Sequence, residues 1–327
     1  MFVTTAMLAD KLDIDLNKSI IKQDSTGRFM SIRYLLPGQR RLETESAYIA
    51  DSNQISILEF VNPNNLLICP TGEYKDPGCS LLVSRQNLEE TFSIAASAFE
   101  EYLTFDDDLK DSFLAGQEMD SLLTICARFF LNTVQVIDQA FNVIGGIQPI
   151  IDPNSRNIAF QRDVSPFSPY TLDKMAKSNL LQESYAFKTA RFYQTTLFKY
   201  RSIIANLFHN GHYLGKLLVI ENEKPLSPGA IDVVNQIAPY ISNLMHKRSS
   251  ELNLTLHTAQ HFILEFLKGN IIDTSFIASQ IATLDWHMND WFVILAIDIK
   301  TADLIDYYSQ ILRKSFEDAL ILPTSGC

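Results

Sequence analysis

The chain has 327 residues, of which 46% are hydrophobic and 20% are charged, a balance typical of globular proteins and unlike that of disordered chains. Its 38 acidic residues outnumber the 27 basic ones and give a formal net charge of −11, which argues against a broad contact with nucleic acid. A chain of this length has room for two or three domains, each with its own core.

Cysteine usage and the N-terminus point to one cellular compartment. The four cysteines lack the CxxC spacing of zinc sites and are too few for a disulfide framework, which favours reduced thiols. The first ten residues lack the basic and apolar regions of an export signal. No apolar run approaches the ~18 residues that a membrane helix needs. We therefore expect a cytoplasmic protein without membrane contact.

Residues 1–86 are expected to form a small α/β domain. A short helix is predicted over residues 4–12. Brief apolar runs, bounded by prolines and glycines, predict buried strands. These strands are expected at residues 46–50, 55–60, 66–69 and 80–83.

Residues 87–131 are expected to form two connecting helices. The first follows Asn87 and covers residues 88–102, and the second begins at the acidic triplet 106–108 and runs to about residue 130. Three carboxylates would also suit a metal ion, but at a helix N-terminus they satisfy free amide groups and the helix dipole. We therefore interpret the triplet as a helix cap and expect neither a metal nor a cofactor.

Residues 132–247 have the pattern of an antiparallel sheet domain. Its strands are expected at residues 134–138, 141–144, 188–193, 202–208 and 213–220. Asn210 and Gly211 lie between the last two strands, and this dipeptide is the strongest short signal of a hairpin turn. A polar loop with several prolines is predicted over residues 147–170, followed by a helix over residues 172–182.

A long helix is predicted to begin at Ser227 and Pro228, because a proline at the first helical position lacks only an amide that needs no partner. Two apolar stripes follow, separated by a polar break at residues 247–251. The first consists of Val234, Ile237, Ile241 and Leu244, and the second includes Leu252, Leu256 and Ile263. Their spacing fits either core packing or a two-stranded dimer seam. Pro239 is expected to bend the helix.

Residues 248–327 continue this linker helix and then begin another α/β segment. A helical stretch is predicted at residues 274–284, an apolar strand at 291–299 and a helix at 303–319. A strand as apolar as this one suits the centre of a sheet and needs neighbours on both sides. Because no second long strand follows, we expect the natural protein to continue beyond residue 327.

No sequence motif marks a catalytic or metal site. The nucleophile elbow, the glycine-rich phosphate loop and paired cysteines are missing from the sequence. His257 and His261 are four residues apart but lack the HExxH pattern of zinc enzymes. Gly145 and Gly146 follow a strand, yet the chain then reaches Pro149 instead of a helix. We therefore expect a protein that is not an enzyme.

A ligand cavity is expected beneath the loop at residues 147–170, where it would cover the sheet. The candidate binding residues are those of the loop and of the neighbouring strands that carry aromatic or basic side chains. They are Phe160, Arg162, Phe167, Tyr170, Lys188, Arg191, Tyr193 and Tyr200. Each of them also fits a structural role without a ligand.

Several of these segments resemble one family. Residues 208–220, with the sequence FHNGHYLGKLLVI, and the helix that follows Leu226-Ser227-Pro228 resemble the closing hairpin and last helix of GAF domains. The sequence FILEFLKG at residues 262–269 and the strand at 291–299 resemble the start of the degenerate GGDEF-like domain of CdaR/PucR-type bacterial transcription regulators. The first 130 residues are similar to the N-terminal receptor region of the same family.

The resemblance implies an α+β, multidomain regulator in four parts. They are an N-terminal receptor-like domain (1–86), connecting helices (87–131), a GAF-like sensor (132–247), and a linker helix with a partial GGDEF-like domain (248–327). It further implies a small-molecule effector, a homodimer, and DNA binding through a C-terminal helix-turn-helix beyond this chain. Cyclic-dinucleotide synthesis is not implied, because the GGDEF signature is missing. Two alternatives are an enzyme with a non-motif active site for a small metabolite or nucleotide, and a helix-mediated interaction module.

Overall fold

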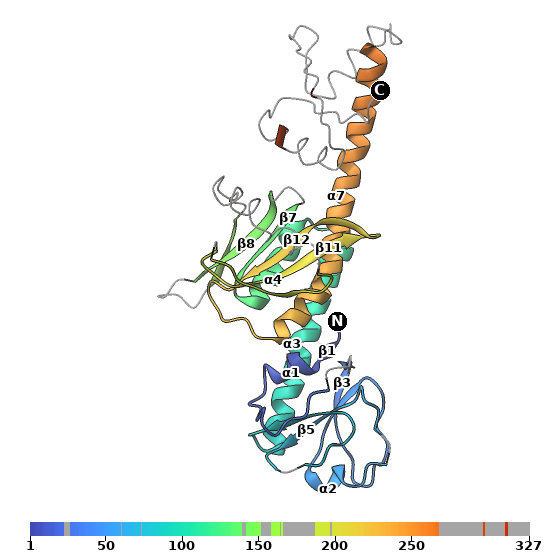
Figure 1. Cartoon of the computed structure of the whole chain (residues 1–327), viewed down its shortest axis with the longest axis vertical. Coiled ribbons are helices and arrows are strands. Elements are labelled where there is room, and N and C mark those ends of the chain that lie inside the picture. The colour runs from blue at the N-terminus through green and yellow to red at the C-terminus, as the bar shows by residue number, and fades with distance from the viewer. Residues whose placement is uncertain are drawn as a thin grey trace.

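The computed structural model describes residues 1–22, 27–59, 61–72, 74–138, 142–151, 158–163, 165, 187–196, 198–267, 297 and 311–312. Helices and strands contribute similar shares of these residues, which confirms the mixed α and β class. Two large sheets, one parallel and one antiparallel, lie along a path of long helices (Figure 1). None of the described helices is both long and apolar enough to cross a membrane.

The N-terminal sheet is parallel. Its strands, in spatial order, are β3 (Ser31–Tyr34), β4 (Ser46–Ile49), β5 (Leu66–Pro70) and β6 (Ser80–Ser84). The last three are apolar runs buried on both faces, as parallel strands usually are, and they confirm the strands predicted in these regions. Strand β3 escaped prediction because it is a half-exposed edge strand with little apolar content.

The two faces of this sheet pack into different cores. Tyr48, Leu67 and Leu81 belong to a small cluster with nearby loop residues, whereas the alternate residues of the same strands join the main core. The strand predicted at residues 55–60 is wrong in its described part, where helix α2 (Ser52–Ile55) is followed by a turn. Asp51 and Gln54 form a reciprocal capping box there, which specifies a helix start.

Helix α3 (Leu88–Leu114) continues through residues 103–108, where the boundary between the two predicted helices was expected, and the second helix begins only at Met119. Asn87 caps its start, with its side chain accepting a hydrogen bond of 2.9 Å from the Glu90 amide. The acidic triplet 106–108 therefore lies inside a helix, and its interpretation as a cap is wrong. Asp106 is buried there and forms ion pairs with Lys110 and with the amino group of Met1, which supply the compensation that a buried carboxylate needs.

The second sheet has six antiparallel strands. In chain order they are β7 (Thr133–Asp138), β8 (Val143–Ile151), β9 (Ile158–Arg162), β10 (Arg191–Tyr193), β11 (Ser202–His209) and β12 (His212–Ile220). Their spatial order is β10-β11-β12-β7-β8-β9. The predicted hairpin is confirmed, since Asn210 and Gly211 both have positive φ angles, of 48° and 81°.

Two sequence predictions for this sheet need correction. The loop predicted over residues 147–170 begins too early, because β8 extends to Ile151 and pairs with β9 in regular antiparallel register. Pro149 faces Phe160 in this pair, and a proline is tolerated near the edge of a sheet. The strand predicted at residues 188–193 is shorter, and the helix predicted at 172–182 lies outside the described residues.

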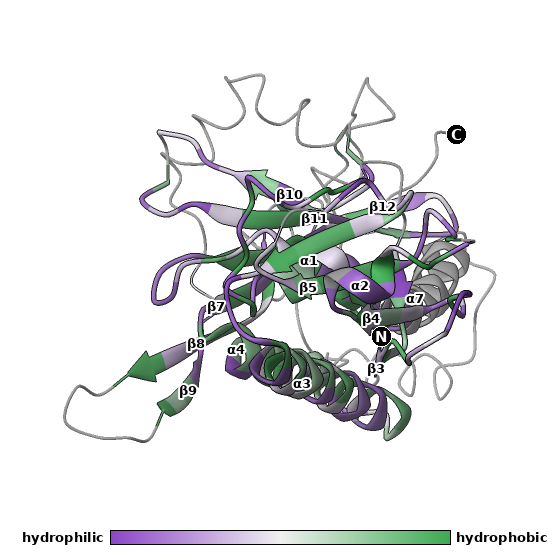
Figure 2. Ribbon diagram, turned by 90° about the horizontal axis from the view of Figure 1, so that it is seen from below, coloured by the Kyte–Doolittle hydropathy of each residue, from purple (hydrophilic) through white to green (hydrophobic). Residues whose placement is uncertain are grey.

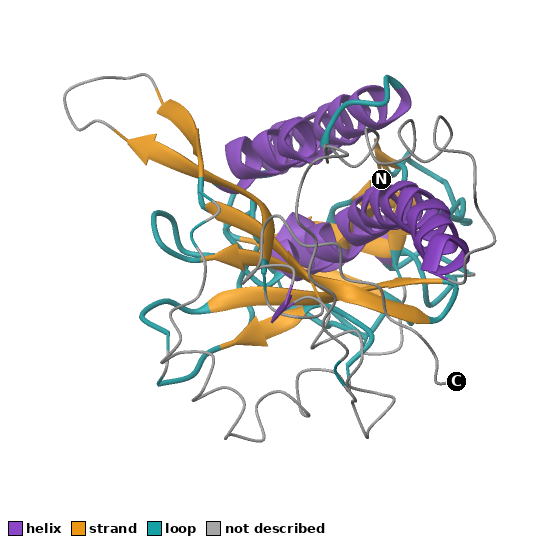
Figure 3. Cartoon of the chain, turned by 90° about the horizontal axis from the view of Figure 1, so that it is seen from above, coloured by secondary structure: helices purple, strands orange, loops and turns teal. Residues whose placement is uncertain are grey.

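One face of the six-stranded sheet is covered by helix α4 (Met119–Phe130) and helix α7 (Gly229–Leu267). Viewed along the long axis, these helices lie on one side of the strands (Figure 3). Strands β11 and β12 are largely apolar (Figure 2), and their alternate residues Ile203, Leu217 and Val219 are fully buried against the helices.

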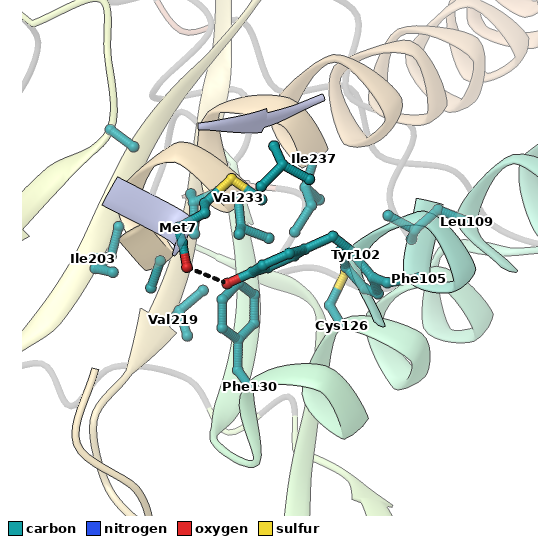
Figure 4. Packing of buried hydrophobic residues seen from close by; sticks show 14 of the residues in the cluster. Met7, Tyr102, Phe105, Leu109, Cys126, Phe130, Ile203, Val219, Val233 and Ile237 are labelled. Carbon is teal, nitrogen blue, oxygen red and sulfur yellow. Dashed lines mark hydrogen bonds between the residues drawn. The ribbon is translucent and has the colours of Figure 1, made fainter. Parts of the chain in front are cut away.

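The first residues of the chain complete this core. Strand β1 (Val3–Thr4) pairs with β2 (Arg28–Phe29), and helix α1 (Thr5–Ala9) packs on α7. Met7 lies among side chains of α3, α4, α7 and the second sheet (Figure 4). The Tyr102 hydroxyl donates a hydrogen bond of 3.3 Å to the Met7 carbonyl. The core therefore runs without a break from residues of the N-terminal sheet to those of the second sheet.

Helix α7 has 39 residues and is continuous through the polar residues 247–251, which interrupt its apolar stripe but not the helix. At about 1.5 Å per residue it is roughly 58 Å long, and it extends well past the second sheet (Figure 1). Pro239 lies within it. The elements predicted at 274–284, 291–299 and 303–319 lie outside the described residues, apart from Ile297 and residues 311–312.

Candidate ligand site

The face of the six-stranded sheet opposite α4 and α7 carries polar side chains in its interior. Because successive side chains alternate between faces, Gln135, Asn206 and Lys216 point away from the helices. They are nevertheless buried, with exposed fractions of 7%, 5% and 3%. Buried lysines are rare in proteins and need compensating partners. This face of the sheet, with its buried polar side chains, is therefore the candidate functional site.

The pairing register arranges the residues of β10, β11 and β12 on this face in three rows. The first row is Tyr193, Ser202 and Ile220, the second is Arg191, Ile204 and Leu218, and the third is Asn206 and Lys216. Adjacent rows are about 7 Å apart, since every second residue of a strand faces the same side.

Lys216 is held by its neighbours in the third row. Its Nζ donates a hydrogen bond of 2.8 Å to Oδ1 of Asn206, whose own Nδ2 donates one of 2.8 Å to the Phe187 carbonyl. Burial, and secondarily the charge of Arg191, lower the pKa of Lys216 to about 8. The side chain is therefore a cation at neutral pH, but one whose charge the protein disfavours.

A second cation, Arg191, lies on the same face of the sheet on β10, two strands away from β12. The Arg191 guanidinium lies 3.9 Å from the centre of the Phe187 ring, and Lys216 Nζ lies 5.7 Å from the same ring centre. Lys216 also lies 5.4 Å from the centre of the Tyr213 ring. The aromatic faces attract both cations and help to offset their mutual repulsion. Positive charge is thus concentrated at the boundary between the second and third rows.

A partly open cavity of about 180 Å³ lies over the first two rows. Its apolar walls come from Tyr193, Phe198, Tyr200, Ile204, Leu218 and Ile220. Gln135 supplies an amide group and Ser202 a hydroxyl group. Lys199 is the one charged side chain among the described lining residues. Gln135 also donates through Nε2 to Oδ2 of Asp163 at 3.3 Å. An apolar cavity with a few polar groups is the usual form of a small-molecule site.

The residues predicted to bind a ligand fall into separate groups. Arg191, Tyr193 and Tyr200 lie on the cavity face, and Tyr193 and Tyr200 line the cavity itself. Phe160 and Arg162 lie on the other face of the sheet, where Arg128 of α4 covers Phe160.

The other predicted residues differ in what the structure says of them. Arg162 pairs with Asp120 of α4, with 3.0 Å between Nε and Oδ2, on the helix-covered face. Lys188 is exposed and precedes β10, away from the lining of the cavity. Phe167 and Tyr170 lie outside the described residues.

The buried polar residues of the sheet, Asn206 and Lys216, were not predicted as site residues from the sequence. Asn206 and Lys216 interrupt apolar strands whose other residues are mostly buried or partly buried. A polar residue at a buried position of such a strand is a signal that sequence reading could have used. The signal becomes specific only with the hairpin register, which places these two residues opposite each other.

The predicted helix stripe is divided between two environments. Val234, Ile237 and Ile241 are fully buried against the second sheet and are core residues of this chain, and Leu244 is partly buried beside them. The positions of Leu252, Leu256 and Ile263 are helical and lie in the part of α7 beyond that core; their side chains are not described. The first half of the stripe is therefore buried within the chain itself.

The hairpin that carries Asn206 and Lys216 also contacts α7. His209, at the end of β11, stacks on His246 of α7 with ring centres 3.7 Å apart and planes inclined by 9°. His246 immediately precedes the segment 247–251, where α7 leaves the sheet. The hairpin that carries these residues of the candidate ligand face thus directly contacts the outgoing helix through its tip.

In the described part of the chain, no group of three or more histidine, cysteine or carboxylate side chains is arranged to hold a metal ion. The three described cysteines are buried, and burial raises the pKa of Cys79 and Cys126 to about 12, which leaves both as unreactive thiols.

No protein-family model matches the chain, and no curated protein has a significantly similar sequence.

Proposed function

We propose that this chain is the ligand-sensing part of a bacterial transcription regulator of the CdaR/PucR type. Residues 132–247 act as a GAF-like sensor that binds a small metabolite, and residues 1–86 act as a receptor-like domain joined to it by residues 87–131. Residues 248–327 contain the linker helix and part of a GGDEF-like domain. In this proposal the chain is a cytoplasmic homodimer without enzymatic activity, and DNA is bound by a domain outside these 327 residues.

The proposal is carried by one arrangement, in which a cavity lies on strands that also touch the outgoing helix. The cavity lies over β10, β11 and β12, while the tip of the β11–β12 hairpin stacks on α7 through His209 and His246. A ligand that shifts these strands changes the packing at the point where α7 leaves the core. Signalling requires such a difference in contacts between the two states.

A screen for ligand-dependent stabilisation tests the binding part of the proposal. We expect at least one metabolite of a library to raise the melting temperature of the wild-type chain, because a ligand that binds only the folded state stabilises it. Leu218→Trp fills the cavity and should abolish this shift. Leu114→Trp makes the same exchange at an exposed position and should retain it. If Leu218→Trp fails to fold, the smaller Ser202→Leu replaces it.

Hydrogen exchange tests the signalling part. With the bound metabolite, we expect altered exchange in β11, β12 and in α7 from residue 246 onward. The proposal is wrong if no metabolite stabilises the wild-type chain, or if binding leaves the exchange of α7 unchanged.

A further inference from the structure

The residues that line the cavity indicate what kind of molecule it accepts. Ile204, Leu218 and Ile220 line it from the sheet itself, and three aromatic side chains complete its apolar wall. Hydrocarbon gains free energy when it leaves water for such a surface, whereas an ionised group loses its hydration there. The wall therefore favours a ligand with an uncharged hydrocarbon body.

Lys199, the charged residue among the described lining residues, does not alter this preference. Its side chain is exposed, and its Nζ lies 4.7 Å from the centre of the Tyr200 ring. The ammonium group thus lies against an aromatic face at the border of the cavity, in contact with water. An exposed cation attracts an anion only weakly, because water screens its charge.

The cavity volume limits the size of the ligand. A buried cavity of about 150 Å³ with apolar walls accommodates benzene, so the cavity of about 180 Å³ here suits a body of similar size. The rings of Tyr193, Phe198 and Tyr200 form part of the wall. Aromatic rings pack well against one another in stacked or edge-to-face arrangements, which favours a ligand with a single aromatic ring.

Gln135 adds one polar requirement. It lies opposite Leu218 in the pairing of β7 with β12, lines the cavity and is only 7% exposed. Its Nε2 is directed to Asp163, with 3.3 Å to Oδ2 and 3.5 Å to the carbonyl oxygen. Among the described residues, none donates a hydrogen bond to its Oε1. A buried acceptor without a partner costs free energy, which a donor group on the ligand would offset.

We infer that the cavity binds a phenol, that is, an uncharged aromatic ring of about the size of benzene that carries a hydroxyl group. The ring occupies the cavity over the first two rows, and the hydroxyl donates a hydrogen bond to Oε1 of Gln135. A phenol is neutral at pH 7, since the pKa of a phenolic hydroxyl is about 10. This inference rests on the proposed sensing function and specifies the class of the effector.

Three compounds test the inference on the full wild-type chain. Phenol is compared with toluene, in which a methyl group replaces the hydroxyl, and with benzoate, which carries a negative charge, by NMR titration. We expect phenol to bind with saturation within the millimolar range, as a compact ligand of few atoms can. Benzoate should bind at least about tenfold more weakly, because its carboxylate would lose hydration against the apolar wall.

Two variants test the role of Gln135. Gln135→Met keeps the length of the side chain but removes the acceptor, so the ratio of phenol affinity to toluene affinity should fall about tenfold. A change in cavity shape alone would weaken both compounds and leave this ratio unchanged. Gln161→Met makes the same exchange at an exposed position of β9 and should retain the wild-type ratio.

A further compound replaces the variant if Gln135→Met fails to fold. Anisole, the methyl ether of phenol, has no hydroxyl proton to donate. The wild-type chain should bind it about tenfold more weakly than phenol. Equal binding of the two compounds would contradict the hydrogen bond to Gln135.

The outcomes separate this inference from the proposed function. The inference is overturned if phenol does not bind in the millimolar range, if benzoate binds as tightly, or if Gln135→Met keeps the wild-type ratio. If a metabolite of another class then binds in the cavity and alters hydrogen exchange in α7, the sensing function stands with a different ligand. If phenol binds with the expected selectivity but no compound alters the exchange of α7, the phenol site stands and the sensing function is wrong.

Discussion

At the scale of single residues, the second sheet is shaped by a few side chains that break its apolar pattern. Asn206 and Lys216 place polarity in the middle of β11 and β12, and Gly146 of β8 allows the backbone of Asp163, which follows β9, to approach closely. Lys216 and Gly146 each have a measurable consequence for stability.

Lys216 should make the stability of the chain depend on pH. Its pKa is about 8 when folded and its ordinary value is 10.5, so the unfolded chain binds more protons between these values. Stability contributed by this group is therefore lowest below pH 8 and rises with pH above it. Relative to Lys216→Met, the wild-type chain should gain about 2 kcal/mol between pH 7 and 9.5. Urea unfolding at several pH values measures this difference.

The exposed Lys224 provides a control for the pH experiment. Lys224→Met should leave the pH dependence of unfolding unchanged. A wild-type stability that runs parallel to that of Lys216→Met across this pH range would contradict the burial of a charged amine at position 216.

Gly146 should resist substitution because backbone occupies the space of a side chain. A Cβ atom there would lie 2.0 Å from the carbonyl oxygen of Asp163, whose amide donates to the Gly146 carbonyl at 2.9 Å. Gly146→Ala should lower the free energy of unfolding by about 1–3 kcal/mol, as strand and loop separate to admit the methyl group. Urea denaturation measures the loss, and Ser165→Ala, at an exposed position nearby, should be nearly neutral.

At the scale of elements, the sequence correctly predicted those helices, strands and turns whose signals lie within a single short segment. The apolar runs of β5, β6 and β7 and the Asn210-Gly211 turn were predicted because their signals lie within the segment itself. Helix α3 was divided in error because Asp106 resembles a cap, while the amino group of Met1, which pairs with it, lies 105 positions away. Burial alone would raise the pKa of Asp106, but hydrogen bonds from Lys110 and that amino group lower it overall.

The same limit applies to the candidate site. Arg191, Tyr193 and Tyr200 were predicted from residue type and strand position, and the structure places them on the cavity face. Phe160 and Arg162 were assigned to a loop, yet they belong to β9 and face α4. Which face a residue takes is set by strand register, and a shift of one residue reverses it. Register depends on pairing between distant segments, which no local pattern reveals.

Helix α7 is fixed along one side by the first residues of the chain. Gln236 accepts from the Phe2 amide at 2.9 Å and donates to its carbonyl at 3.0 Å, as a neighbouring strand would. Thr4 donates to Asp232 at 2.6 Å, and the Gly229 amide donates to Asp10 at 2.7 Å. We call these the N-terminal contacts of α7; they lie on its first two turns.

Gln236→Ala should weaken the attachment of the N-terminal segment. It removes two hydrogen bonds and leaves backbone groups of Phe2 unpaired at a partly buried place, which should cost about 1–3 kcal/mol. Amide exchange of residues 2–9 should increase more than exchange of the second sheet. Asn243→Ala, an exposed site on the same helix, is the control. Equal effects of the two substitutions would show that the N-terminal contacts contribute nothing to stability.

At the scale of the whole molecule, the chain is arranged around α7. Its first half is packed between the N-terminal segment and the second sheet, and its second half extends past them (Figure 1). The buried stripe of Val234, Ile237 and Ile241 is already occupied within the chain. A homodimer seam, which remains a prediction, is therefore expected in the second half, at Leu252, Leu256 and Ile263.

Sedimentation velocity of the full chain tests this seam. We expect twice the monomer mass for the wild-type chain and the monomer mass for the double variant Leu252→Glu, Leu256→Glu, since charges at such positions oppose helix pairing. Thr258→Glu places a charge about opposite the stripe on an ideal helix and should remain dimeric. A monomeric wild-type chain, or a double variant that stays dimeric, would contradict the seam.

The N-terminal contacts also bear on how the protein is made. Phe2 and Asp10 find their partners on α7 at separations of 234 and 219 positions. At ~5–20 residues per second, the ribosome needs about 11–47 seconds to translate that distance. Until then, Val3, Met7 and Leu8, which end fully or almost fully buried, have no completed core to enter. Residues 2–10 are thus synthesised well before their partners, and they can be enclosed only after α7 has been synthesised.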